Sequence, residues 1–288
     1  GAGAGDYIRM AYKVEAQDMA SSGWNYTSSS SDITLSFWVK SSVSQNFNYL
    51  LHTSDGTGRL FPSETGNLTA DTWTKITKTI PGDSNLTFNN DNGIGLILHI
   101  YQFLGTNYTS SSVTNNQWQN YSGSEQTPDQ TSTWYTTNDA TFEITGVQLE
   151  VGSVATDFEH RSYGQELALC QRYFQTISRS SNANSVNGTF AAGTCNDNGS
   201  SGGILQVMVR FQTTMRAVPT MTQTGTFSHH VSGVNVADTT VAFSQAFIDG
   251  VKCTGTQTAF VSADGSCGEL TSKYSDTSTA IIKANAEL

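Results

Sequence analysis

The sequence predicts an all-β protein: an N-terminal jelly-roll β-sandwich, a short linking helix and a second, C-terminal β-sandwich-like domain. Short apolar–polar alternations recur along the chain, no helical apolar stripe occurs before residue 162, and Ser, Thr, Asn and Gly dominate the polar residues. The 288 residues are enough for two separate cores. We therefore expect a first domain at 1–158, the linking helix at 159–176 and a second domain at 177–288.

The expected strands of the first domain alternate apolar and polar side chains, so that each buries one face. They cover residues 7–14, 33–40, 73–80, 94–103 and 142–151. Gly146 interrupts the alternation of the last strand and predicts a β-bulge. Trp38 falls on the polar side of its strand, whereas Trp24 and Trp73 are interpreted as packing residues.

The linking helix is predicted from a capping box and a short apolar stripe. Ser162 can act as N-cap, with Gln165 three residues on as its partner. Leu167, Cys170 and Phe174 follow at positions i, i+3 and i+7, so we expect Cys170 to be a small core residue.

The second domain is expected to be all-β as well. Its predicted strands lie around 189–191, 204–211, from 218 onward, 241–247, 258–262 and 280–286.

Charge and hydropathy exclude two classes of partner. The net charge of −10 repels phosphate backbones, so nucleic acid is not expected as a ligand. No run of eighteen apolar residues occurs, so membrane insertion is not expected either. The first residues, GAGAGDYIRM, have neither an initiator Met nor a signal-peptide pattern, and the chain is interpreted as a C-terminal piece of a longer protein or as a trimmed chain.

Catalysis is not expected. The sequence has no G-x-S-x-G, P-loop or HExxH motif. Glycoside hydrolysis needs two carboxyl groups about 5–10 Å apart. Glu143 and Glu150 share a strand, but their odd separation places them on opposite faces unless Gly146 shifts the register. His99, beside Leu98 and Ile100 in a strand, is interpreted as a satisfied, half-buried histidine.

A carbohydrate-binding site is the sharpest hypothesis for a ligand. Pyranose rings present apolar C–H faces that stack on aromatic rings. The long polar segment 105–139 carries aromatic side chains among Asn, Gln and Ser, and a loop of that length is often functional. Packing of the loop on the sandwich and a subunit contact are the alternatives. The candidate residues are Trp38, Trp118, Tyr121, Trp134 and Tyr135.

A structural calcium ion is a weaker hypothesis. Oxygen-bearing side chains gather after Pro81-Gly82, although the EF-hand loop pattern is absent. A turn that bonds its own backbone is the alternative. The candidate ligands are Asp83, Asn85 and Asp91, with Asn89 and Asn90 beside them.

Residues 147–175, reading VQLEVGSVATDFEHRSYGQELALCQRYFQ, resemble a junction found in fibre-type proteins of tailed phages. The upstream segments LSFWVKSS, ADTWTKITKTIPGDSN and NNDNGIGL resemble the jelly-roll, carbohydrate-binding-module-like domain of that family. Downstream, FQTTMRAVPTMT and IIKANAEL resemble its β-rich C-terminal domain.

The resemblance implies a tail-fibre component of the virion that recognises glycans on the host surface, polysaccharide or lipopolysaccharide, without catalysis. It further implies a homotrimer, other virion tail proteins as partners, and assembly in the host cytoplasm. Cys253 and Cys267 flank a plausible hairpin and could be bonded, but free thiols are expected in that compartment. A polysaccharide-degrading tailspike enzyme and a purely structural fibre or capsid decoration protein are the alternatives.

Overall fold

The computed structural model describes residues 2–180, 189–197, 203–231, 234–256, 267–272 and 279–287. It is all-β, as predicted, and its described part contains two α-helices among the strands. Neither helix is long and apolar enough to cross a membrane. The chain divides into two compact units, Gly1–His160 and Arg161–Glu287, whereas the sequence placed the first boundary at residue 158.

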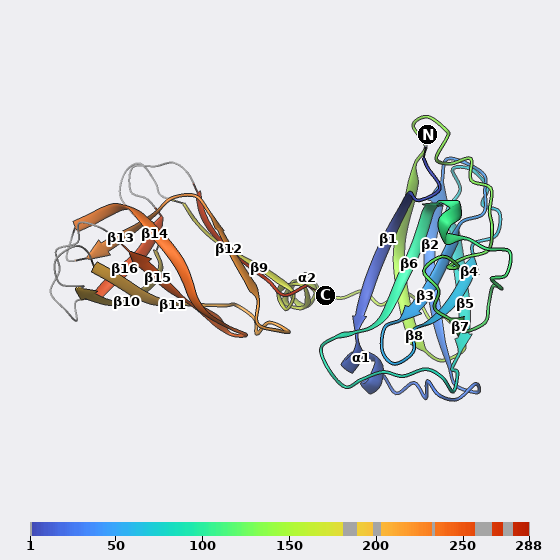
Figure 1. Cartoon of the computed structure of the whole chain (residues 1–288), viewed down its shortest axis with the longest axis horizontal. Coiled ribbons are helices and arrows are strands. Elements are labelled where there is room, and N and C mark those ends of the chain that lie inside the picture. Colours follow the sequence, from blue (N-terminus) through green and yellow to red (C-terminus); the bar gives the residue numbers. More distant parts are fainter. Residues whose placement is uncertain are drawn as a thin grey trace. The chain divides into compact units, whose positions relative to one another are not determined.

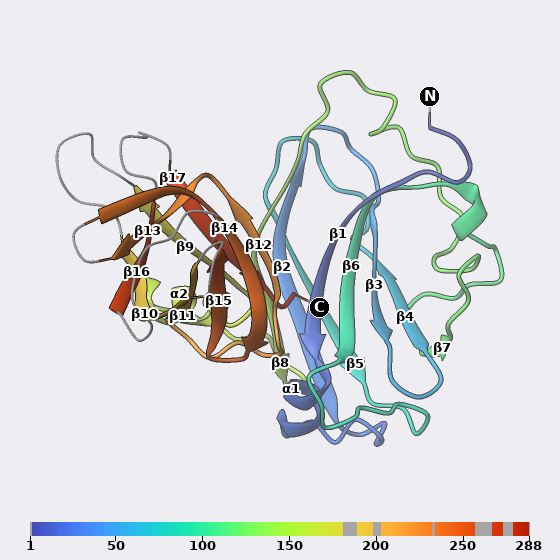
Figure 2. The ribbon, with the colours of Figure 1, turned by 60° about the vertical axis from the view of Figure 1, so that its left-hand side comes forward.

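The first unit is a sandwich of two antiparallel sheets. The chain passes between the sheets at each of the connections β1–β2, β2–β3, β4–β5 and β5–β6, as in a jelly roll. Figure 2 shows the strands of the larger sheet side by side. That sheet has the order β1 (Tyr7–Glu15), β6 (Ile94–Leu104), β3 (Asn48–Thr53), β4 (Arg59–Glu64), β7 (Gln119–Asn120). The smaller has the order β5 (Thr74–Pro81), β2 (Asp32–Ser41), β8 (Phe142–Val151).

The core of this unit lies between the facing sheets. Phe37 of β2 meets Tyr49 of β3 edge-to-face, with ring centroids 5.4 Å apart, and both side chains are fully buried. Leu96 and Leu98 of β6 belong to the same cluster. Burying a large apolar side chain contributes about 1.5–3 kcal/mol, so this layer holds the two sheets together.

The predicted bulge at Gly146 is confirmed. Gly146 has φ 60°, and the register between β2 and β8 shifts between Ser36 and Trp38. Two further elements of this unit, helix α1 (Ala16–Ser21) and the 3-10 turn η1 (Thr106–Tyr108), were not expected from the sequence.

Helix α2 (Tyr163–Gln171) has the predicted capping box, since Ser162 and Gln165 bond each other's backbone N–H groups. The predicted apolar stripe is wrong at its C-terminal end. The helix ends at Gln171, and Phe174 begins strand β9 (Phe174–Ser180), which pairs with β17 (Thr279–Asn285). Cys170 is exposed and not a core residue, because no residue of this short helix is buried.

The second unit combines a closed barrel with a three-stranded sheet (Figure 1). Closure leaves the barrel strands without free edges. The sheet has the order β12 (Thr220–Thr224), β17, β9. The barrel has the order β10 (Thr189–Asp197), β11 (Gly203–Arg210), β15 (Gly250–Thr256), β14 (Val234–Phe247), β13 (Phe227–Val231), β16 (Cys267–Ser272). The expected strand at 258–262 lies outside the described residues.

The barrel interior is apolar and includes Leu205, Val207 and Val251. Cys253 is a free, buried thiol in this cluster, and burial raises its pKa to about 12. The thiol is therefore a packing group and not a reactive nucleophile.

Candidate functional site

The five predicted sugar-binding residues are not brought together. Trp38 lies on the outer face of the three-stranded sheet, opposite Lys75 and Thr145 of its neighbouring strands, and 41% of its surface is exposed. Tyr121 lies at the outer face of the five-stranded sheet, on the other side of the sandwich. Tyr135 is exposed and tilts over Phe103, with ring centroids 4.8 Å apart.

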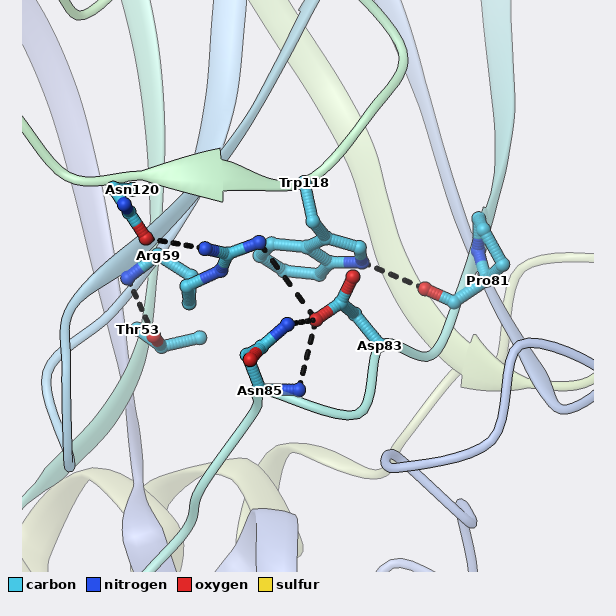
Figure 3. Close-up of polar contacts among 7 residues, drawn as sticks. All are labelled: Thr53, Arg59, Pro81, Asp83, Asn85, Trp118 and Asn120. Atoms are coloured by element: carbon cyan, nitrogen blue, oxygen red, sulfur yellow. Dashed lines mark hydrogen bonds and ion pairs between the residues drawn. The ribbon is translucent and has the colours of Figure 1, made fainter.

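Trp118 and Trp134 fix the long loop to the sandwich. The indole N–H of Trp118 donates to the carbonyl of Pro81 at 2.7 Å (Figure 3). Its ring meets that of the buried Phe61, with centroids 5.3 Å apart. The indole N–H of Trp134 donates to the carbonyl of Thr141 at 3.0 Å, and the ring packs against the core. Both contacts correspond to the loop-packing alternative.

The turn that carries Asp83 and Asn85 is closed by hydrogen bonds between these two residues. Asp83 Oδ1 accepts the backbone and the side-chain N–H of Asn85, each at 2.8 Å, and Arg59 lies 3.7 Å away (Figure 3). Burial opposes ionisation of Asp83, but the Asn85 bonds and the Arg59 charge outweigh it and lower the pKa. A calcium ion here would have to displace both partners.

The other predicted calcium ligands are also engaged. Asp91 Oδ1 accepts the N–H of Gly93 at 2.8 Å, and Asn89 donates to Asp55 through both its backbone and its side chain. Within the part of the chain that the structure describes, no group of three or more His, Cys, Asp or Glu side chains could hold a metal ion. Calcium binding stays a prediction.

The bulge at Gly146 places Glu143 and Glu150 on the same face of the sheet, because they pair with Lys40 and Thr34, both on the outer side of β2. Six or seven strand residues still separate them by about 20 Å, too far for the carboxyl pair of a glycosidase. Glu143 pairs with Lys40 at 2.8 Å. Hydrogen bonds from Gln148 and Thr156 lower the pKa of Glu150, the opposite of what a general acid needs.

A cavity of about 160 Å³ lies on the outer face of the five-stranded sheet. Four neighbouring strands supply its floor, because β1, β6, β3 and β4 pair in that order. The long loop supplies its remaining wall. The polar and aromatic residues that line it are Arg9, His52, His99, Tyr121 and Gln126, with Leu50, Leu60 and Ile97 beside them.

Aromatic rings form a continuous row beside the cavity. His52 stacks on Tyr121 with centroids 4.2 Å apart and an interplanar angle of 12°. The row continues from His52 to His99 at 6.1 Å and from His99 to Tyr101 at 5.9 Å. The period of two in strands explains it, since His99 and Tyr101 point to the same side of β6, away from the core.

The loop is held over the cavity by two sets of hydrogen bonds. Tyr101 donates its hydroxyl to Gln126 Oε1 at 2.7 Å, and the backbone N–H of Tyr121 donates to the carbonyl of Gly58 at 2.8 Å. A Cβ at Gly58 would lie 3.2 Å from that of Tyr121, so the bare glycine permits the close approach that stacks Tyr121 on His52.

Both histidines of the cavity are neutral at pH 7. Burial, together with the charges of Arg9, His52 and Lys13, lowers the pKa of His99 to about 3. Burial and Arg9 also lower the pKa of His52. His99 is 5% exposed, and its Nδ1 atom is buried with no hydrogen-bond partner among the described residues. The expectation that His99 is satisfied is therefore wrong at this atom.

Sequence reasoning missed Arg9, His52, His99 and Gln126 as members of one site. The strand with His52, NYLLHT, is buried on both faces and has no alternation to recognise. Arg9 was within an expected strand, but only the register of β1 against β6 brings it opposite Tyr101.

Comparison with known proteins does not assign the chain. No known protein family matches it, and no curated protein does. One solved structure is a cycloisomaltooligosaccharide glucanotransferase of Paenibacillus sp. complexed with cycloisomaltoheptaose. The alignment covers 97% of this chain and 40% of the glucanotransferase chain, at 7% identity and a TM-score of 0.15. A likeness this low does not indicate a shared fold.

Proposed function

We propose that the first unit binds glycans without catalysis, through the cavity on the outer face of its five-stranded sheet. The observation that carries this proposal is the stacked pair of Tyr121 and His52 at the wall of a cavity that also offers neutral hydrogen-bonding groups. A sugar presents the same combination, an apolar ring face and hydroxyl groups.

The size of the cavity supports one sugar ring as the bound group. The cavity has a volume of about 160 Å³. Drug-sized ligands occupy pockets of about 300–1,000 Å³. One residue of a longer glycan is therefore held in the cavity, and the rest of the glycan extends along the surface.

The wider role that we propose is receptor binding by a virion tail fibre, with host polysaccharide or lipopolysaccharide as ligand and other virion tail proteins as partners. The resemblance of residues 147–175 to phage fibre junctions supports it. We also propose a homotrimer, in which several weak sites gain affinity by acting together. The mass of the protein in solution tests the trimer.

Binding of the protein to a glycan array tests the function, with Tyr121→Ala and Tyr135→Ala as matched variants. Both remove an exposed tyrosine of the long loop, but Tyr135 contacts Phe103 and does not line the cavity. We expect Tyr121→Ala to weaken retention about five- to a hundredfold, since ring stacking is worth about 1–3 kcal/mol, while Tyr135→Ala binds as the unmodified protein does.

Three results would contradict the proposal. Retention on no glycan favours a purely structural protein, and release of oligosaccharide from a bound polysaccharide favours an enzyme. Equal loss in the two tyrosine variants would place the site outside the cavity.

A further inference from the structure

The cavity carries a positive charge that its neighbours do not neutralise. Among the described residues that line it, Arg9 alone is charged at pH 7, because His52 and His99 are neutral. The chain as a whole carries −10, so a cationic cavity runs against its overall charge. A neutral sugar would not need this feature.

The guanidinium of Arg9 is held in place without a carboxylate. It lies over the ring of Tyr7, 4.9 Å from the centroid, and its residue pairs with Tyr101 across the sheet. None of the ion pairs formed between described residues includes Arg9. The cation–π contact and a hydrogen bond to the hydroxyl of Tyr101 orient the side chain, and its remaining N–H donors are left for another group.

His99 lines the same cavity and has a buried polar atom. Nδ1 of His99 is buried without a hydrogen-bond partner within the described chain. An unsatisfied buried polar atom is unfavourable, and a ligand hydroxyl that bonds it removes the penalty. The cavity thus combines a donor fork for an anion, a polar atom for a hydroxyl and a ring wall formed by Tyr121.

We infer that the cavity recognises an acidic sugar residue, a pyranose that bears a carboxylate, with Arg9 binding the carboxylate and His99 a hydroxyl. The inference rests on the proposed function and names its ligand class. A planar guanidinium matches a carboxylate with two parallel hydrogen bonds. The ring of the sugar lies against Tyr121.

The acidic surface of the protein does not prevent this binding. At an ionic strength of 0.1 M, charges separated by more than about 10 Å are largely screened from each other. A carboxylate bonded to Arg9 is within hydrogen-bonding distance of the guanidinium, and its attraction is much less screened than the repulsion from distant side chains.

The test compares three panels of polysaccharides at 0.15 M NaCl: carboxylate-bearing alginate, polygalacturonate and hyaluronate; neutral dextran, mannan and galactan; and dextran sulfate with phosphomannan. The proteins are the unmodified chain, Arg9→Gln and Arg161→Gln. Arg161 is an exposed arginine whose ion pair with Glu166 is on the surface, so Arg161→Gln removes the same charge outside the cavity.

We expect retention on at least one carboxylate-bearing polysaccharide and not on the neutral panel. Arg9→Gln should lower the affinity about ten- to a hundredfold, as loss of a hydrogen bond to a charged group does. Arg9→Lys keeps the charge but not the planar fork, and should lower it less. Arg161→Gln should bind as the unmodified protein, and all variants should melt at the same temperature because both arginines are exposed.

Neutral glycans bound equally by the unmodified protein and by Arg9→Gln would overturn the inference and leave the proposed function intact. Retention on the sulfated or phosphorylated panel alone would overturn the carboxylate as the recognised group. If the protein is retained neither on any of the eight polysaccharides nor on the glycan array, both the inference and the proposed function are overturned.

Discussion

His99 shows how one residue links the cavity to the stability of the fold. Its imidazole is buried on β6. It faces the positive charges of Arg9 and Lys13 on β1, the imidazole of His52 on β3 and the neutral ring of Tyr101 on its own strand. These surroundings hold it neutral down to a pH of about 3, whereas the unfolded chain protonates it near 6.5.

The pH dependence of unfolding follows from that difference. Between pH 6.5 and 3 the unfolded state binds the proton that folded His99 refuses, so acidification favours unfolding, by up to about 1.4 kcal/mol per pH unit. We expect His99→Gln to reduce this dependence in urea titrations at pH 4, 5, 6 and 7. His160→Gln is the control, because His160 is exposed, and it should leave the dependence unchanged. An unchanged dependence in His99→Gln would contradict the neutral, buried imidazole.

Two tryptophans test the difference between a side chain that packs on the core, Trp134, and one that is exposed, Trp38. Trp134→Ala removes the hydrogen bond to Thr141 and the contact with the core, and we expect the free energy of unfolding to fall by about 2–4 kcal/mol. Trp38→Ala removes an indole from the exposed face of β2 and should change the free energy of unfolding by less than about 1 kcal/mol. Urea unfolding measures both, and equal losses would show that the loop contact contributes no stability of its own.

At the scale of elements, the sequence predicts the strands that bury one face, but it does not predict those that bury both faces. The expected strands at 7–14, 33–40 and 94–103 agree with β1, β2 and β6 within one residue at each end. Strand β3 is buried on both sides, and β4 carries Pro62 within it, so neither has the pattern of a half-buried strand.

The candidate site could be predicted only in part for a related reason. The sequence indicates that the loop 105–139 carries aromatic rings, but not which of them face inward. Arg9, His52 and His99 come from three strands, and only the pairing order β1–β6–β3 brings them to one cavity. Pairing order is a property of the whole sheet, and no local pattern in the sequence records it.

The bulge of β8 can be tested as an element. Gly146 has φ 60°, where a residue with a Cβ loses about 1–2 kcal/mol, and a Cβ there would meet Trp38 only at an ordinary contact distance of 3.4 Å. We expect Gly146→Ala to destabilise the protein by that amount in urea unfolding. A Cβ at Gly164, in helix α2, would have no heavy atom within 4 Å. Gly164→Ala should therefore stabilise the helix, by up to about 1 kcal/mol. Destabilisation by both changes would contradict the conformational explanation.

At the scale of the whole molecule, the two units have separate cores. The cluster around Phe37 and Leu96 contains residues of the first unit alone, and the cluster around Leu205 and Val251 residues of the second, within the described ranges. The residues that line the cavity all belong to the first unit. Among the described residues, the core cluster and the cavity lining of the first unit include none after His160.

This independence predicts that residues 1–160 fold alone and bind glycans through the cavity. A domain of 150 residues buries about 68–70% of the surface of its unfolded chain, enough for a stable core. We expect the fragment to unfold in one cooperative transition and to bind a single-site monosaccharide probe with the affinity of the full chain. Its retention on a polysaccharide should be weaker if the second unit carries the homotrimer, because joint binding by several sites is then lost. A fragment that folds but binds no probe would show that the cavity is not the site, and one that does not fold would show that the first core needs the second unit.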